Sequence, residues 1–195
     1  MKMEFPQKKI YLVRHGETEW TLSGQHTGFS DIPLTANGEK QAEKIGKKLR
    51  GHTFGSILTS PLQRAERTCA IAGFSKAAKP DRDLVEWNYG DFEGLTSQEI
   101  RKTHPHWTIF SDGAPRGESV TDVGDRADRV LAKIQPLQGD VVLFSHGHFL
   151  RVLAARWLQL SPQEGRLFAL DPGSISILGF EKGLPVLFLW NEANT

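Results

Sequence analysis

Residues 9–20, KIYLVRHGETEW, contain the segment around which the chain is organised. Residues 10–13 are a short apolar run with β-branched members, and Gly16 ends it, which predicts a buried strand rather than a helix. Arg14 and His15 follow at the carboxyl end of that strand, where ligands bind in an open α/β sheet. Arginine can donate to two phosphoryl oxygens, a histidine nitrogen can act as a nucleophile, and glycine lets the backbone come close. The stretch therefore suits a phosphoryl group.

Arg-His-Gly on its own is more often an ordinary strand end, so the rest of the chain has to support this interpretation. A second buried strand, residues 141–144, also ends in a polar residue, a histidine (His146) and a glycine. A helix follows directly, so free amides at its start can also face an anion. Arg64 falls in the first turn of a helix after the predicted strand at residues 55–60, and Glu86 follows a further strand. Candidate residues thus come from four places where a predicted strand ends.

Composition narrows the class of protein. The 195 residues suit a single α/β domain, residues 1–195, large enough to form a core without disulfides. The net charge is +1 with acids and bases interspersed, which argues against nucleic acid as a partner. Cys69 is the only cysteine, so no internal disulfide framework exists. The N-terminal lysines precede no long apolar segment, and no run is long enough to cross a bilayer, so we expect a cytoplasmic protein with no membrane partner.

The hydrophobic patterns predict alternating strands and helices. A polar loop is expected after Trp20. Strands are expected at residues 10–13, 55–60, 79–86 and 141–144, with a C-terminal hairpin of residues 174–180 and 185–190. Helices are expected from a cap at Thr35 or Asn37 to Gly51, over residues 61–73, from a Thr96–Glu99 capping box to Lys102, from Ser119 to Ile134, and over residues 149–158.

Four blocks, RHGETEW, SPLQRAERT, EWNYGDFEG and SHGHFLR, occur in this order almost from end to end of the chain. In these blocks the chain resembles the histidine phosphatase family, also called the phosphoglycerate-mutase-like family. The resemblance implies a three-layer α/β/α sandwich with a mostly parallel central sheet. EWNYGDFEG, WTIFSDG and GES look most like the fungal sedoheptulose-1,7-bisphosphatase branch.

The resemblance also implies roles for five catalytic residues. His15 would attack phosphorus and carry the phosphoryl group as a phosphohistidine. Arg14, Arg64 and His146 would surround the non-bridging oxygens, which accounts for most of the catalysis because phosphoryl transfer depends on positioning and charge stabilisation. Glu86 would protonate the leaving alkoxide and then take a proton from the attacking water. The scheme requires no metal and no cofactor.

Further positions match residues that contact substrate in relatives. Some of them can also be explained by a purely structural role. Relatives often carry asparagine where this chain has Thr21, so an amide contact becomes a hydroxyl contact. The remaining candidates for substrate binding are Thr27, Gly28, Tyr89, Gly147 and His148. Thr27 and Gly28 can equally form a plain turn, and Tyr89 can simply pack. A zinc site is not expected, because there is no cysteine cluster and no i,i+4 histidine pair.

Three functions remain open from the sequence. The expected one is a metal-independent phosphomonoesterase acting on a small phosphorylated metabolite, a sugar phosphate or bisphosphate. A cofactor-dependent phosphoglycerate mutase is the alternative, although only 46 residues separate Gly94 from Val141, where mutases carry a longer insertion. A non-catalytic phosphate-binding module is the third. A second phosphate would need its own cation, for which the candidates are Arg101, Lys102, Arg116 and His148. The sequence does not indicate the oligomeric state.

Overall fold

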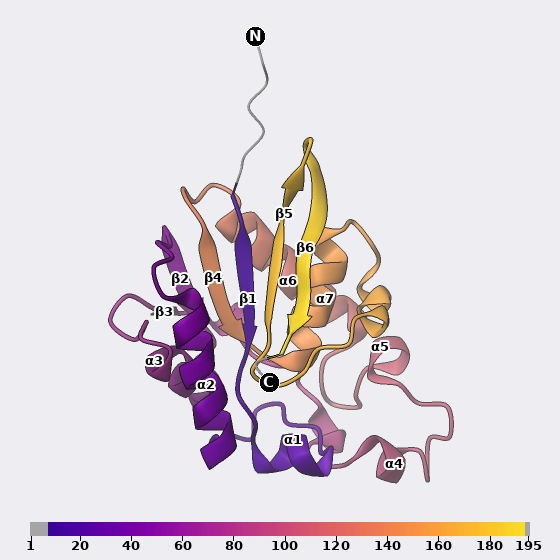
Figure 1. Cartoon of the computed structure of the whole chain (residues 1–195). Helices are drawn as coiled ribbons and strands as arrows, with labels where there is room; N and C mark the ends of the chain where they lie inside the picture. The colour runs from indigo at the N-terminus through magenta and orange to yellow at the C-terminus, as the bar shows by residue number, and fades with distance from the viewer. Residues whose placement is uncertain (1–7, 194–195) are drawn as a thin grey trace.

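A computed structural model describes residues 8–193, in which a six-stranded sheet has helices on both faces (Figure 1). The strand order is β3-β2-β4-β1-β5-β6. The first four strands in this order run parallel, and β5 and β6 each run antiparallel to the preceding neighbour. The strands are β1 (Ile10–Arg14), β2 (Ser56–Thr59), β3 (Lys79–Pro80), β4 (Val141–Ser145), β5 (Ile175–Glu181) and β6 (Leu184–Glu192).

Helices α2 and α3 cover one face of the sheet, and α6 and α7 cover the other (Figure 1). This is the three-layer α/β/α arrangement expected from the sequence. The α-helices are α1 (Glu19–Ser23), α2 (Ala36–Leu49), α3 (Gln63–Ile71), α4 (Ser97–Ile100), α5 (Ile109–Asp112), α6 (Val120–Ile134) and α7 (Gly147–Trp157). Three 3₁₀ turns add to them: η1 (Arg82–Leu84), η2 (Gly90–Phe92) and η3 (Pro162–Leu167).

Strand β1 is buried on both faces, which explains its uninterrupted apolar sequence. Ile10 and Leu12 belong to the core under α6 and α7. Tyr11 and Val13 belong to the core under α2 and α3. Side chains alternate between the faces of a strand, so the four-residue run contributes equally to both cores.

The register of β1 and β4 determines where the site forms. Arg14 lies opposite Ser145 across this parallel pair, and the His15 amide donates to the Ser145 carbonyl at 3.0 Å. His15 and His146 therefore leave the sheet at the same edge. Their ring centroids are 5.2 Å apart.

Helix starts follow the predicted caps. The Thr35 hydroxyl accepts from the Gly38 amide at the start of α2. Thr96 and Glu99 form the predicted capping box of α4. Ser119 caps α6 and forms a capping box with Asp122.

Several predicted segments differ from the structure. The strand expected over residues 79–86 is only Lys79–Pro80, because the Asp81 side chain accepts from the Asp83 amide and begins the η1 turn. The helix expected from residue 61 begins at Gln63. The loop expected after Trp20 begins with the last residues of α1. That helix starts at a capping box between Thr18 and Thr21.

The C-terminal hairpin is confirmed. Strands β5 and β6 pair antiparallel, and Lys182 and Gly183 between them both have positive φ angles, 50° and 84°. Two consecutive positive φ angles are typical of a tight type I′ turn. Within residues 8–193, no helix is long and apolar enough to cross a membrane.

Candidate active site

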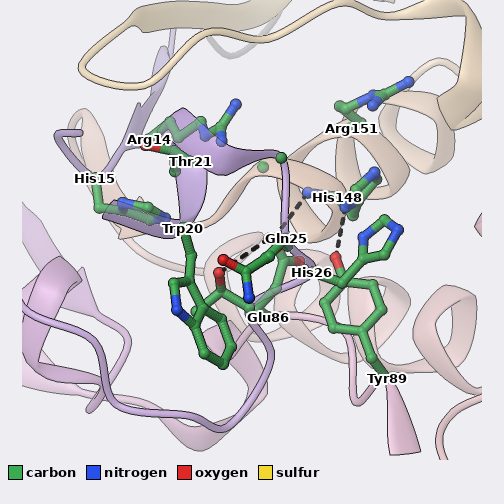
Figure 2. A pocket seen from close by; sticks show the side chains of 13 residues that line it. Arg14, His15, Trp20, Thr21, Gln25, His26, Glu86, Tyr89, His148 and Arg151 are labelled. Carbon is green, nitrogen blue, oxygen red and sulfur yellow. Dashed lines mark hydrogen bonds between the residues drawn. The ribbon is translucent and has the colours of Figure 1, made fainter. Parts of the chain in front are cut away.

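A cavity of about 180 Å³ lies at the carboxyl ends of β1 and β4 (Figure 2). It is smaller than the roughly 300–1,000 Å³ typical of pockets for drug-sized ligands, so it suits a small metabolite. The lining residues are Arg14, His15, Trp20, Thr21, Gly24, Gln25, His26, Thr27, Glu86, Tyr89, Gly147, His148 and Arg151.

The hydrogen bonds of His15 determine which of its nitrogens is reactive. Its Nδ1 lies 2.7 Å from the carbonyl oxygen of Gly16. A carbonyl can only accept, so Nδ1 carries the proton and Nε2 carries the lone pair. The Gly16 amide in turn donates to Thr68 Oγ1 at 3.1 Å, which fixes this turn against α3. Nε2 is therefore the ring nitrogen that is available to act as a nucleophile.

Burial keeps the His15 imidazole neutral. Desolvation lowers the pKa of His15 well below its usual value, the positive charges of Arg64 and Arg14 lower it further, and only the bond to Gly16 opposes them. A neutral imidazole at pH 7 retains the lone pair that an attack on phosphorus requires.

Arg14 has a donor group that no protein atom satisfies. Its Nη1 donates to the Leu170 carbonyl, but its buried Nε has no hydrogen-bond partner among the described residues. A Cβ at Gly147 would lie only 3.1 Å from the guanidinium carbon, so glycine lets the start of α7 pack against this cation. Leaving a buried donor unpaired costs about 1–3 kcal/mol. Arg14 is therefore an incompletely paired cation at the cavity, which favours an anion there.

Arg64 and His146 are fully buried and do not line the cavity. The Nε of Arg64 donates to Nδ1 of His146 at 3.2 Å, so the His146 proton is on Nε2, which lies 2.7 Å from Ser60 Oγ. Desolvation, and then the charge of Arg64, lower the pKa of His146 well below its usual value. His146 is thus neutral, and its one N–H is engaged with Ser60.

The remaining guanidinium donors of Arg64 hold the loop after α1. Nη1 donates to the Ser30 carbonyl at 3.0 Å, and Nη2 donates to the carbonyls of Thr27 and Gly28 at 3.1 and 2.8 Å. Together with the bond to His146, these contacts occupy four of the five guanidinium donors and leave one Nη1–H. Arg64 therefore ties this loop to the site.

Glu86 caps α7 from outside the helix. His146, at the N-cap position, makes no side-chain capping bond. Instead, Oε1 of Glu86 accepts from the amides of Trp87 and Phe149, both at 2.9 Å, and Oε2 accepts from the His148 amide at 3.0 Å. Amides at a helix start favour a carboxylate there. Oε2 accepts only one of these bonds, so it keeps an unused lone pair, and Glu86 lines the cavity.

Arg126 on α6 holds the backbone that leads into Glu86. Its Nη1 donates to the carbonyls of Asp83 and Val85, and its Nη2 donates to the Glu86 carbonyl. The same guanidinium forms a buried ion pair with Glu118 at 2.8 Å. Arg126 thus positions Glu86 without lining the cavity.

Replacing Arg126 with methionine is expected to lower the free energy of unfolding by about 3–5 kcal/mol, because the Glu118 carboxylate and three carbonyls lose their partner. Urea denaturation measures this loss. Arg129→Met is the matched control, because Arg129 pairs with Asp83 on the surface and should contribute less than about 1 kcal/mol. Equal effects of the two substitutions would contradict the assigned role.

His26, Tyr89 and His148 form one wall of the cavity (Figure 2). The rings of His26 and Tyr89 lie 4.7 Å apart, and the Tyr89 hydroxyl is 2.5 Å from Nδ1 of His148. Desolvation raises the pKa of Tyr89 well above its usual value, so this residue stays a phenol. Desolvation, then the charge of Arg151, lower the pKa of His148, which stays neutral.

His26 should make the stability of the protein pH-dependent. Desolvation, and next Arg101, lower the pKa of His26 from 6.5 to about 4. Between these values the unfolded chain binds more protons than the folded one, so stability is lost as the pH falls through this window, and above it His26 contributes no pH dependence. His26→Gln, which can still bond to Ser97, should reduce the slope of the unfolding free energy by up to about 1.4 kcal/mol per pH unit.

Urea unfolding across this pH window measures the slope for the wild type and for His26→Gln. His106→Gln, at an exposed loop position, is the control. A slope that stays the same in His26→Gln would contradict the burial argument.

The structure places most of the predicted substrate-binding residues on the cavity. Thr21, Thr27, Tyr89, Gly147 and His148 line it. The Thr21 hydroxyl is already engaged in the α1 capping box, where it donates to the Thr18 carbonyl at 2.8 Å. Gly28 does not line the cavity, and its amide donates to Glu93 Oε1 at 2.8 Å. Gly28 thus supports the loop that Arg64 holds.

The other cations considered for a second phosphate lie outside the cavity. Arg101 and Lys102 are exposed, and Arg101 donates to the Trp107 carbonyl at 3.0 Å. Arg116 pairs with Asp91 and is 84% exposed. None of the three lines the cavity.

Sequence reasoning missed several residues of the site. Trp20, Gln25, His26 and Arg151 line the cavity, and Ser60 is bonded to His146. The signal available for Arg151 is its spacing, because residues four apart share one face of a helix and Arg151 is four residues after Gly147. Within residues 8–193, no group of three or more histidine, cysteine or acidic residues could hold a metal ion.

Known proteins are similar to this chain in both sequence and fold. An acid phosphatase of Mycobacterium tuberculosis is 41% identical, over 90% of this chain and 88% of its own length. Sedoheptulose 1,7-bisphosphatase of Saccharomyces cerevisiae is 38% identical, over 80% of this chain and 69% of its own length. A 2,3-bisphosphoglycerate-dependent phosphoglycerate mutase of Mesorhizobium japonicum is 34% identical, over 96% of this chain and 95% of its own length.

A solved structure, that of the Rv3214 product from Mycobacterium tuberculosis, superposes with a TM-score of 0.92 at 38% identity, over 96% of this chain and 99% of that one. The sequence profile of the histidine phosphatase superfamily (branch 1) matches residues 10–193. The chain belongs to the histidine phosphatase superfamily.

Proposed function

We propose that the chain is a single-domain phosphomonoesterase that hydrolyses a small phosphorylated metabolite, a sugar phosphate or bisphosphate, through a phosphohistidine on His15. The observation that carries the proposal is the neutral His15 with its free Nε2 on a cavity that also contains Arg14 and Glu86. The acid phosphatase and sedoheptulose bisphosphatase relatives support hydrolysis and a sugar phosphate. We place the reaction in the cytoplasm, consistent with the buried, unpaired thiol of Cys69.

In the first step, the lone pair of His15 Nε2 attacks phosphorus while the bond from phosphorus to the ester oxygen breaks. The Glu86 carboxylic acid gives its Oε2 proton to the leaving alkoxide. Arg14 and the positive charge of Arg64 stabilise the charge on the non-bridging oxygens, while His146, whose N–H is engaged with Ser60, packs against the His15 ring.

In the second step, water replaces the alcohol. Glu86, now a carboxylate, removes a proton from the water as its oxygen attacks phosphorus. The bond between Nε2 and phosphorus breaks, inorganic phosphate leaves, and His15 and Glu86 return to their starting protonation states. The balance needs no oxidant, reductant or cofactor.

Phosphate release from a panel of sugar phosphates and sugar bisphosphates, with EDTA present, tests this function. 2- and 3-phosphoglycerate belong in the panel, together with a coupled assay for their interconversion. We expect release of phosphate from at least one ester. Isomerisation without release of phosphate would identify a mutase. If the protein showed neither activity, a non-catalytic phosphate-binding module would remain.

A further inference from the structure

Asn191 has a backbone conformation that most residues avoid. It lies at the penultimate position of β6, and its φ angle is 55°, in the left-handed region. Asparagine tolerates this region better than most side chains do, but surrounding contacts must hold a residue there. Strand β6 runs antiparallel to β5, and β5 runs antiparallel to β1. Strands β1 and β6 therefore end at the same edge of the sheet, the edge that holds the cavity (Figure 1).

The Asn191 side chain fixes the segment 169–174, which connects η3 with β5. Its Oδ1 accepts from the Asp171 amide at 2.7 Å, and its Nδ2 donates to Asp171 Oδ2 at 2.8 Å. The Asn191 amide donates to Ser176 Oγ at 3.0 Å, which holds the backbone of Asn191 itself. One side-chain amide thus binds both the backbone and the carboxylate of Asp171.

The other side of this segment contacts the end of β1. The Leu170 carbonyl accepts from Nη1 of Arg14, and the Ser174 carbonyl accepts from the Arg14 amide at 3.2 Å. The Gly173 amide donates to the His15 carbonyl at 2.9 Å. The segment therefore holds the Arg14 guanidinium and the backbone of His15, and it is itself held by β6.

The Asp171 carboxylate also acts on Arg14 through its charge. Desolvation lowers the pKa of Arg14, and the charges of Glu86, Tyr89 and Asp171 oppose this shift. Asn191 holds that carboxylate in place with its Nδ2. Its bonds thus affect both the geometry and the charge around Arg14, although Asn191 does not line the cavity.

We propose that Asn191 is a positioning residue for the phosphoryl-binding end of β1. It fixes the segment 169–174 through Asp171, and that segment holds Arg14 and His15 in the arrangement that binds a phosphoryl group. The inference rests on the proposed function, which assigns that group to Arg14 and His15.

Calorimetric binding of inorganic phosphate tests the proposal without turnover. Asn191→Ala should raise the dissociation constant roughly 10- to 100-fold, the effect of losing one well-placed hydrogen bond to a charged group. Asn191→Gly should raise it as much, because glycine adopts a positive φ without strain but lacks the side-chain amide. Wild-type affinity in Asn191→Gly would mean that only the backbone conformation matters, and the proposal would be wrong.

Exchanging the two side chains provides a rescue. Asn191→Asp places a second carboxylate against Asp171 with no donor between them, so it should weaken phosphate binding as Asn191→Ala does. Adding Asp171→Asn restores an amide facing a carboxylate at an unchanged net charge, and it should recover most of the affinity. If the double variant binds phosphate no better than Asn191→Asp does, the contact between these side chains does not position the site.

Lys182→Ala is the matched control. Lys182 also has a positive φ, 50°, but it lies at the opposite end of the same hairpin. Its replacement should leave the dissociation constant of phosphate unchanged. An equal loss in Lys182→Ala would assign the effect to the stability of the hairpin and overturn the proposal.

The assay for phosphate release separates this inference from the proposed function. A loss of phosphate affinity in Asn191→Ala that the side-chain exchange reverses supports the positioning role even if the wild type hydrolyses no ester. Affinity that is unchanged in Asn191→Ala, or a wild type that does not bind phosphate, overturns the role even if the wild type is an active phosphatase.

Discussion

His15→Ala is expected to lower kcat for phosphate release by at least about 10⁴-fold, the scale of losing a covalent nucleophile. The reason is that Nε2 of His15 would be the atom that bonds to phosphorus, and neither Arg14 nor Arg64 has a nucleophilic lone pair. Steady-state release from the best ester of the panel measures the loss. Mass spectrometry after rapid quenching should find a phosphoryl group on His15 in the wild type and none in the variant.

The variant should fold normally. Within residues 8–193, the His15 side chain bonds only to the carbonyl of the next residue and contacts the His146 ring, so its loss should change the free energy of unfolding by less than about 2 kcal/mol. His106→Ala, on the exposed loop after α4, is the matched control and should retain full activity. A folded His15→Ala protein with substantial turnover would refute the phosphohistidine mechanism.

The parts of the fold that could be predicted are those whose causes are local. The residues of β1 are apolar on both faces because β1 is a central strand. The length of this run and its lack of alternation predict a buried strand without knowledge of its neighbours. The caps at Thr35, Thr96 and Ser119 each join a side chain to a backbone amide three residues later, so the sequence contains both partners. The β5–β6 hairpin is similarly specified by its Lys-Gly turn.

The wrong boundaries arise from competition between local signals. Residues 79–86 have strand character, but the Asp81 side chain bonds to a backbone amide two residues on, and that bond favours a turn over continued pairing. The α1 capping box was missed because its third position is Thr21 rather than the usual glutamate or glutamine, and a hydroxyl serves equally well there.

The candidate catalytic residues could be located because the ends of neighbouring parallel strands converge. His15 and His146 follow β1 and β4, whose pairing brings them together. Arg151 could not be found in this way. Its position depends on long-range packing, since Phe110 and the carbonyls of Gly165 and Arg166 hold its guanidinium at the cavity. Arg101 has the same charge, but its bond to the Trp107 carbonyl holds it outside the lining.

Glu86→Gln is expected to lower kcat/KM for alkyl phosphates by about 10²–10⁴-fold, the usual contribution of a general acid. The alkoxide is a poor leaving group and needs the Glu86 proton as the ester bond breaks. With p-nitrophenyl phosphate, the phenolate leaves without a proton, so kcat/KM should fall less than about 10-fold. The second step still needs a base, so the variant should release a burst of nitrophenol followed by a slow steady state.

The leaving-group comparison also separates chemistry from structure. Glu86 caps α7 through the amides of His148 and Phe149, and a glutamine places an NH₂ group against one of these donors, so stability should fall by about 1–3 kcal/mol. That loss would affect both substrates alike. Glu181→Gln, at the exposed hairpin turn, controls for the change of charge. Equal losses of kcat/KM on the alkyl and nitrophenyl esters would mean that Glu86 acts only by holding the helix, and the proton would then have to come from another group at the cavity.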